Sequence, residues 1–278
     1  MSPQLLIAGH IVKDVTSDGW HPGGGALYAA AQAVRLGVKT AAVTACDADI
    51  EPSELVSGVE WQVRRLDRSI EFENTYSEGH RTQRVTPTSA PISLDDIPEA
   101  WRDVSLVLLT PVFHDVASEL PRQLVRQGTI VGLGAQGWLR RLDGDRVLPG
   151  VVEAAPEWLC GDVVFLSEED VTEPEAAERW REHVPTVVLT RGRDGYTVWD
   201  AMGRHDIAPV AGCERDPTGA GDVFATAYLV RFGETRDGLE SARFAAAAAA
   251  VSVEAAGIAS VATREQIETR LHASGVSG

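Results

Sequence analysis

The chain has 278 residues, of which 44% are hydrophobic and 24% charged, and its 25 Lys+Arg against 41 Asp+Glu give a formal net charge of −16 at pH 7. These values are typical of a globular protein with a substantial core, and the acidic balance disfavours binding to nucleic acid or to an anionic membrane, which needs a basic face. Lysine occurs only twice, at Lys13 and Lys39, and neither lies in a Walker or protein-kinase motif, which excludes those two enzyme classes.

Short apolar runs alternate along the chain with stretches of helical spacing. The runs predict strands over 5–8, 40–44, 106–109, 129–133, 163–166 and 186–189. The stretches between and after them predict helices over 26–36, 116–127, 173–183, 221–231, 239–256 and 264–273. Continuous apolar strands that alternate with amphipathic helices are typical of a mostly parallel sheet covered on both faces. The sequence therefore predicts a single doubly wound α/β domain over 1–278.

Two segments, 12–20 and 59–88, break this rhythm because polar and apolar residues alternate in them, as in WQVRRL and RTQRVTP. Alternation with period two is typical of strands with one solvated face, so both segments are expected in a small antiparallel sheet. We interpret this sheet as a β lid over the carboxyl ends of the main strands, where doubly wound folds bind ligands. The alternative is an edge extension that only stabilises the fold.

The segment 216–225, DPTGAGDVFA, joins small residues directly to a predicted helix. Small residues leave backbone N–H groups free to point at one anion, and the positive end of the helix dipole lies beside them. Asp222 could accept the proton of an attacking hydroxyl, and Thr218 could contact a phosphate. A capped helix start without chemistry is the alternative. The candidates for an anion hole around a transferring phosphoryl group are Gly219, Ala220 and Gly221.

This segment resembles the signature DTxGAGD of the PfkB-type carbohydrate kinase (ribokinase-like) family, with Pro217 in place of the usual Thr. The resemblance implies a ribokinase-like fold, Asp222 as the catalytic base and the Gly-Ala-Gly backbone as the anion hole. It also implies ATP and Mg²⁺ as cofactors and a small polyol as the acceptor.

A second segment, 21–30 with the letters HPGGGALYAA, is similar to the N-terminal GG motif of that family, with Tyr28 where Asn is common. The resemblance implies that Gly24 and Gly25 allow close approach of a polyol and that Asp14 binds its hydroxyls. A dinucleotide site is the rival interpretation of these glycines, but the GxGxxG spacing is not matched. The branch that contains myo-inositol kinases is similar around further polar residues, which we expect to bind acceptor hydroxyls: Asn74, Arg81, Gln83 and Gln136.

The resemblance also assigns residues to the nucleotide and its metal. The segment 167–170 is similar to the NxxE motif of the family and implies a magnesium role for Asp170, although a helix N-cap explains the same residues. The segment 190–195 is similar to the TxGxxG segment near the nucleotide, although a hairpin turn explains its arginines too. The implied nucleotide-binding residues are Ser167, Thr190, Arg191, Gly192, Gly195, Thr218, Ala255 and Gly257.

These observations predict an ATP-dependent kinase that transfers the γ-phosphate to a hydroxyl of a cyclitol or sugar, with a myo-inositol-like acceptor favoured. A nucleoside kinase is one alternative, because Trp20, Tyr28 and Trp138 could stack on a base. A catalytically retired binding protein on the same fold is the other. An exposed lid edge could pair two copies into a homodimer. The N-terminal run lacks the basic lead of a signal peptide, so a cytoplasmic protein is expected.

Overall fold

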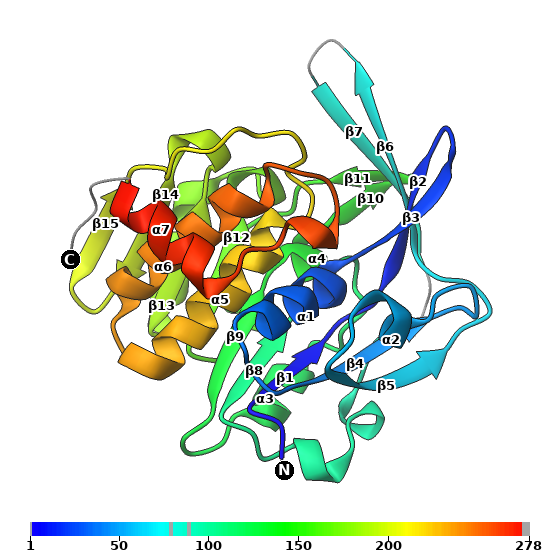
Figure 1. Cartoon of the computed structure of the whole chain (residues 1–278), viewed down its shortest axis with the longest axis horizontal. Coiled ribbons are helices and arrows are strands. Elements are labelled where there is room, and N and C mark those ends of the chain that lie inside the picture. Colours follow the sequence, from blue (N-terminus) through cyan, green and yellow to red (C-terminus); the bar gives the residue numbers. More distant parts are fainter. Residues whose placement is uncertain (1, 78–79, 88–89, 274–278) are drawn as a thin grey trace.

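The computed structural model describes residues 2–77, 80–87 and 90–273, which form two sheets and the helices around them (Figure 1). Within these residues the main sheet has nine strands in the order β15-β14-β13-β12-β9-β8-β1-β4-β5. In chain order they are β1 (Leu5–Ala8), β4 (Thr40–Cys46), β5 (Val59–Arg65), β8 (Leu106–Leu109), β9 (Ile130–Gly134), β12 (Val163–Ser167), β13 (Thr186–Thr190), β14 (Tyr196–Asp200) and β15 (Gly203–Ile207). Every expected main strand is present, β1 and β8 with the predicted bounds.

The topology of the main sheet places a ligand-binding edge near its centre. Strands β5 to β13 pair in parallel, and β14 and β15 add an antiparallel hairpin at one edge. The chain runs outward from β1 through β4 and β5, then returns to β8 on the other side of β1. This change of direction is a topological switch point, and doubly wound sheets bind ligands beside it at the carboxyl ends of the strands. The predicted doubly wound α/β fold is confirmed.

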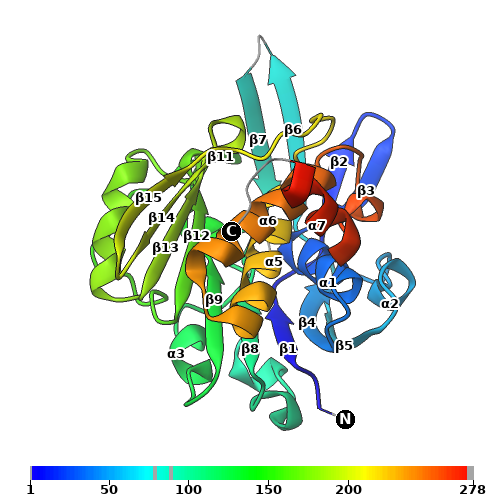
Figure 2. The ribbon, with the colours of Figure 1, turned by 60° about the vertical axis from the view of Figure 1, so that its left-hand side comes forward.

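Helices cover both faces of the main sheet unequally (Figures 1 and 2). One face carries α1 (Gly25–Arg35), α5 (Ala220–Thr235), α6 (Gly238–Ser252) and α7 (Arg264–Ala273), whose apolar residues pack on Leu5, Ile7 and Phe165. The other face carries mostly short helices, packed on Leu6 and Val164. The short helices of the chain are α2 (Pro52–Leu55), α3 (Leu120–Leu124), α4 (Gln136–Leu139), η1 (Leu94–Asp96), η2 (Glu99–Trp101), η3 (Glu168–Asp170), η4 (Pro174–Glu182), η5 (Gly192–Asp194) and η6 (Ile258–Ser260).

Two of the predicted helices differ from the prediction. The helix expected over 116–127 is only the short α3, because Pro121 lacks an N–H and its ring would clash with a helical carbonyl four residues earlier. The segment expected to be helical over 173–183 forms the 3₁₀ helix η4. Its buried side chains, Ala177 and Trp180, lie three residues apart, which aligns them in a helix with three residues per turn.

The second sheet, which we call the lid, has six strands among the described residues, in the order β10-β11-β7-β6-β2-β3. They are β2 (Val12–Thr16), β3 (Gly19–Gly23), β6 (Glu71–Ser77), β7 (His80–Thr86), β10 (Arg141–Asp143) and β11 (Arg146–Leu148). The hairpin of β6 and β7 extends away from the main sheet (Figure 1). The β10–β11 hairpin was not predicted from the sequence.

The prediction for the lid is wrong in two respects. Strand β5, from the segment 59–88, belongs to the edge of the main sheet and pairs in parallel with β4. An edge strand with one solvated face has the same alternation as a lid strand, so the pattern could not separate the two. In addition β2 pairs with β6 in parallel, so the lid is not purely antiparallel.

None of the described helices combines the length and the apolar composition that a membrane-spanning helix needs.

Candidate active site

The loop before α5 is fixed in place by its backbone. The N–H groups of Arg215 and Asp216 donate to the carbonyl of Val253, at 2.7 and 3.1 Å. The N–H of Thr218 donates to the Asp216 carboxylate at 3.0 Å, and Gly219 takes a φ of 76° that favours glycine. At the start of α5 the N–H of Ala220 donates to the Pro217 carbonyl at 3.2 Å. The other first N–H groups of an α-helix, which here include that of Gly221, have no acceptor inside the helix, so these are the groups that an anion could bind.

Tyr28 of α1 packs directly against this loop. A Cβ on Gly219 would overlap the Tyr28 ring, so the ring and the loop backbone touch only because residue 219 is glycine. Burial raises the pKa of Tyr28, and the charges of Asp216, Asp14 and Asp222 raise it further. Tyr28 therefore lies in one cluster with the predicted base and the predicted acceptor-binding carboxylate, and its hydroxyl stays protonated.

Asp222, in the first turn of α5, lies at the switch point. A Cβ on Gly25, the first residue of α1, would lie 2.7 Å from the Asp222 Oδ1 and 2.7 Å from the Cβ of Thr110, which follows β8. The carboxylate is therefore held between the start of α1 and the end of β8. Glycine at position 25 permits this approach of the Asp222 carboxylate, and the close approach of a polyol expected for the GG motif stays a prediction.

The Asp222 carboxyl group titrates near neutral pH. Burial raises its pKa to about 7, the positive charge of Arg140 opposes the rise, and the carboxylates of Asp170 and Asp115 add to it. A general base works best when its pKa is near the operating pH, because it is then both deprotonated and basic. The surroundings of Asp222 thus raise its pKa into the range in which a carboxylate can take the proton of a hydroxyl.

Arg140 is the cation of this site, and the sequence did not identify it as a site residue. It follows α4, and one guanidinium N–H donates to the Val112 carbonyl at 2.9 Å. The guanidinium also lies 5.3 Å from the centre of the Phe72 ring in the lid, and its charge lowers the pKa of both Asp222 and Asp170. It thus contacts the lid at Phe72 and acts electrostatically on Asp222 and on Asp170. The one signal in the sequence is its position four residues after Gln136, at the end of the same short helix.

Asp170 caps a 3₁₀ helix. Its Oδ2 accepts the N–H of Ser167 at 2.8 Å, and the Ser167 hydroxyl accepts the N–H of Glu169 at 3.3 Å, so the expected alternative of a capped helix start is present. Burial raises the pKa of Asp170, whereas Arg140 and hydrogen bonds from Ser167 and Gln136 lower it. Among the described residues, no group of three or more His, Cys, Asp or Glu could hold a metal ion. The magnesium role of Asp170 stays a prediction.

The predicted acceptor residues gather on two parts of the lid. The Asp14 carboxylate lies over Gly23, where a Cβ would overlap it, and Gly24 has a φ of 97° where a Cβ would lie 2.5 Å from the His10 carbonyl oxygen. On the outer hairpin, the Gln83 amide donates to the Asn74 side-chain oxygen at 3.0 Å.

Two further residues, Gln136 and Arg81, were also predicted to bind the acceptor. Gln136 begins α4, and its side chain hydrogen-bonds to Asp170. Arg81 belongs to β7, but its side chain lies outside the described part of the structure.

The predicted nucleotide residues are only partly brought together. Ser167 and Thr190 are paired at the ends of β12 and β13. Arg191 instead donates to the Glu175 carboxylate and to the Thr197 hydroxyl, both at 2.6 Å, and Arg204 donates to the same carboxylate. Gly192 and Gly195 have φ angles of 50° and 90° in the turn that follows β13, as the hairpin alternative expected.

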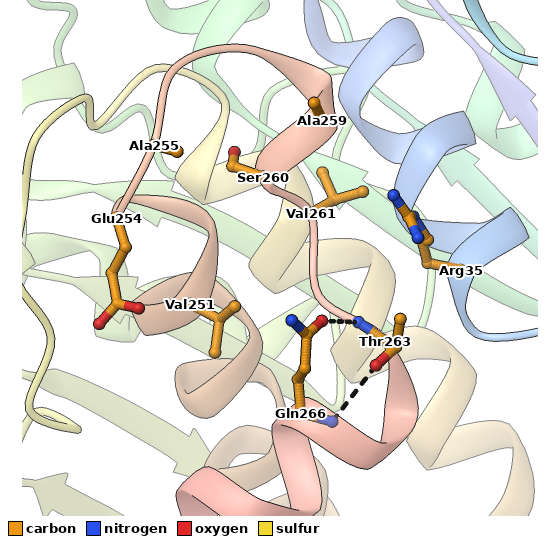
Figure 3. Close-up of a pocket in the computed structure, with 9 residues that line it drawn as sticks. All are labelled: Arg35, Val251, Glu254, Ala255, Ala259, Ser260, Val261, Thr263 and Gln266. Carbon is orange, nitrogen blue, oxygen red and sulfur yellow. Dashed lines mark hydrogen bonds between the residues drawn. The ribbon is translucent and has the colours of Figure 1, made fainter.

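Ala255 lines a hollow of about 280 Å³ between the ends of α6 and α1 and the start of α7 (Figure 3). Its polar lining includes Arg35, Glu254 and Thr263, and Asp222 is not part of it. Gly257 follows in the same connection with a φ of 71°. The adenine contact predicted for these two residues remains a prediction.

We expect Gly221→Ala to lower the rate of phosphoryl transfer without lowering the stability of the fold. A Cβ on Gly221 meets no atom within 4 Å, and alanine is favoured over glycine in a helix by up to about 1 kcal/mol, so the free energy of unfolding should hold or rise. The methyl group would occupy the open space in front of the first-turn N–H groups, so phosphoryl transfer should fall. Thermal unfolding and initial rates test this, with Gly233→Ala, at the other end of α5, as the control that should stay active.

Residues 163–264 match the model of the pfkB family carbohydrate kinases. An inositol 3-kinase of Zea mays is 28% identical over 163 residues, which is 57% of this chain and 42% of that protein. An inositol 3-kinase of Oryza sativa subsp. japonica is 31% identical over 144 residues, 50% of this chain and 36% of that protein. The matched part thus spans less than half the length of these curated relatives.

Solved structures match nearly the whole chain. A pyrophosphate-dependent kinase in the ribokinase family, complexed with a pyrophosphate analog and myo-inositol, superposes with a TM-score of 0.76 at 22% identity over 95% of this chain and 99% of that chain. The Arabidopsis thaliana ribokinase complexed with ribose and ATP has a TM-score of 0.72 at 20% identity, over 98% and 99% of the two chains. At these identities the likeness establishes the fold. The chain therefore carries a pfkB-family carbohydrate kinase segment within a ribokinase-like fold, which confirms the resemblance seen in its sequence.

Proposed function

We propose that this protein is a small-molecule kinase that transfers a phosphoryl group to a hydroxyl of a cyclitol or sugar, with a myo-inositol-like acceptor favoured. The observation that carries the proposal is Asp222, whose carboxyl has a pKa of about 7 and lies in the first turn of α5 at the switch point of the sheet. A base of this strength beside an open helix N-terminus suits the attack of an alcohol on a phosphoryl group.

The proposed reaction uses three groups of this chain. Asp222 takes the proton of the acceptor hydroxyl as its oxygen bonds to phosphorus, and the bond from phosphorus to the bridging oxygen of the donor breaks. The backbone N–H groups of Gly219 and Gly221 bind the equatorial oxygens of the group in transfer. Arg140, whose charge acts on Asp222 and Asp170, neutralises part of the charge on the same oxygens. The leaving group departs as the phosphorylated remainder of the donor.

The donor is proposed to be ATP with Mg²⁺. Support comes from Ser167 and Thr190, which lie side by side at the strand ends, and from the fold shared with a ribokinase that binds ATP. When bound, Mg²⁺ neutralises phosphate charge, and most of its ligands here would be phosphate and water oxygens, as is usual for this ion. Pyrophosphate is the donor to compare, because a relative of the same fold depends on it.

The acceptor is proposed from the polar side chains that face the site. The charges of Asp14 and Asp222 both act on Tyr28, and a carboxylate at Asp14 can accept from a second hydroxyl of the acceptor. Asn74 and Gln83 add amide groups on the hairpin of the lid. Curated relatives that match half of this chain are inositol 3-kinases, which supports a cyclitol.

A donor-by-acceptor screen tests the function. Purified protein is incubated with Mg²⁺ and either ATP or pyrophosphate, and each of myo-inositol, other cyclitols, pentoses, hexoses and nucleosides, with product read by ³¹P NMR. We expect a phosphomonoester from a cyclitol or sugar, absent with Asp222→Asn. Transfer only to nucleosides would replace the acceptor class, and no transfer from either donor would contradict the proposal in favour of a binding protein.

A further inference from the structure

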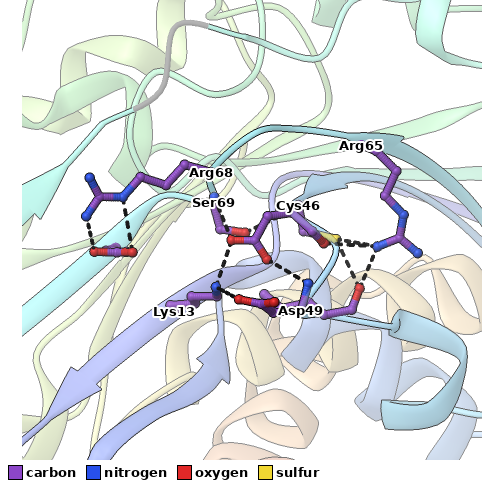
Figure 4. A network of polar contacts seen from close by, with 9 residues as sticks. Lys13, Cys46, Asp49, Arg65, Arg68 and Ser69 are labelled. Atoms are coloured by element: carbon purple, nitrogen blue, oxygen red, sulfur yellow. Dashed lines mark hydrogen bonds and ion pairs between the residues drawn. The ribbon is translucent and has the colours of Figure 1, made fainter.

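A buried ion pair joins the lid to the main sheet at Lys13. This residue lies on β2, and its Nζ is 2.7 Å from the Asp47 Oδ2 and 2.7 Å from the Asp49 Oδ2, just beyond the end of β4 (Figure 4). The side chains of Lys13 and Asp47 are 8% and 9% exposed, whereas that of Asp49 is 67% exposed. A buried lysine is rare unless it is paired, and the Nζ also lies 4.7 Å from the centre of the Trp20 ring.

The partner Asp47 makes three further hydrogen bonds, through its backbone N–H and both carboxylate oxygens. Its N–H donates to the Ser69 hydroxyl at 2.8 Å, its Oδ2 accepts the Ser69 N–H at 3.1 Å, and its Oδ1 accepts the Asp49 N–H at 3.1 Å. Burial disfavours both charged groups, yet the hydrogen bonds between them outweigh it, so the pKa of Lys13 is raised and that of Asp47 is lowered. The pair therefore stays ionised at neutral pH.

These contacts lie at two of the places where the chain passes from the main sheet into the lid. Lys13 is at the first crossing, from β1 into β2, and Ser69 is at the second, from β5 into β6. The Lys13 N–H also donates to the Ile70 carbonyl at 2.9 Å, which joins the two crossings. Asp47 thus contacts Lys13 on β2 and Ser69 just before β6, and so joins two of the segments that enter the lid.

Asp14 is the next residue along β2, and successive side chains of a strand point to opposite faces. Asp14 shares its face with Phe72, its partner on β6, and Phe72 contacts Arg140 of the active site. Lys13 points to the other face, toward Asp47. The ion pair therefore lies on the face of β2 opposite to the face that carries Asp14.

We infer that Lys13 is a positioning residue for acceptor binding: its buried pair with Asp47 fixes β2 against the main sheet and so sets the place of the Asp14 carboxylate. This inference rests on the proposed function for its kinetic consequence. The pair lies on the opposite side of β2 from the phosphoryl site, so it has no direct contact with the donor.

The test compares Lys13→Met with Lys39→Met, since the chain has only these two lysines and Lys39 is exposed. Methionine keeps most of the apolar length of the side chain and removes the charge. In Lys13→Met we expect the KM for the acceptor to rise at least tenfold, with the KM for the donor within twofold of wild type. Amide hydrogen exchange should accelerate in β2 and in the first residues of β6, with the main strands unchanged. Lys39→Met should match wild type in every measurement.

Further variants keep the inference open to refutation. If Lys13→Met does not fold, Asp47→Asn, which keeps the shape of the side chain, should show the same rise in acceptor KM, whereas Asp49→Asn at the exposed partner should change it less than threefold. Equal losses for donor and acceptor, or unchanged exchange in β2, would overturn the inference. Absence of transfer by the wild type would contradict the proposed function instead, and the exchange data would still decide whether Lys13 fixes β2.

Discussion

Asp222→Asn is expected to lower kcat by about 10²–10⁴-fold, the range that a general base contributes. Asparagine has nearly the same shape, so the close approach to Gly25 persists, but the amide cannot take a proton. Donor affinity should change little, because the backbone N–H groups of the loop stay in place. Initial rates and donor binding by calorimetry check both expectations. A variant that keeps more than a tenth of the wild-type kcat would contradict the assignment of the base.

The pH dependence follows from the same carboxyl group. With a pKa of about 7 in the folded protein, Asp222 should give kcat/KM an acid limb that rises with pH and levels off above about 7. Because this pKa is raised above its ordinary value of 3.8, the folded state binds the proton more tightly than the unfolded state, and the contribution of Asp222 to stability falls as pH rises between those values. Asp222→Asn should therefore have a higher Tm than wild type at pH 8 and a smaller difference at pH 5.

The sequence predicted those parts of the site that are local in the chain. The segment that contains Gly219 and Asp222 could be interpreted by itself, since its small residues at a helix start leave N–H groups accessible and Asp222 places a carboxylate in the first turn. The parallel strands were predicted for a similar reason, because a strand buried on both faces reads as one apolar run. Such features need no knowledge of what packs against them.

The parts that were missed depend on contacts between distant segments. The sequence did not predict the ion pair that Arg191 forms with Glu175, which lies sixteen residues earlier in the chain. Strand β5 has the alternation of a lid strand, and only its pairing with β4 shows that it ends the main sheet. Tyr28 seemed an exception in a sugar-binding motif, yet its ring packs on Gly219 and supports the loop. The spacing of residues within one segment does not show which distant segment that segment will contact.

Arg140 is the main case of a site residue that only the fold shows, and its removal is the second large effect we expect. Arg140→Met should lower kcat/KM by about 10²–10³-fold, as loss of one preorganised donor to a developing negative charge commonly does. Arg140→Lys should recover part of the loss, because it restores a charge without the planar fork of the guanidinium. The neighbouring Arg141→Met is the matched control, since Arg141 is exposed and donates to the Pro149 carbonyl.

A shift of the acid limb distinguishes a role at the reaction centre from a role in packing alone. The positive charge of Arg140 lowers the pKa of Asp222, so Arg140→Met should raise that pKa and move the acid limb of kcat/KM to higher pH. Arg140→Lys should return the limb toward its wild-type position, and Arg141→Met should leave it in place. If Arg140→Met loses activity with an unmoved limb, the guanidinium acts through its hydrogen bond to the Val112 carbonyl and its contact with Phe72, and not through its charge on the base.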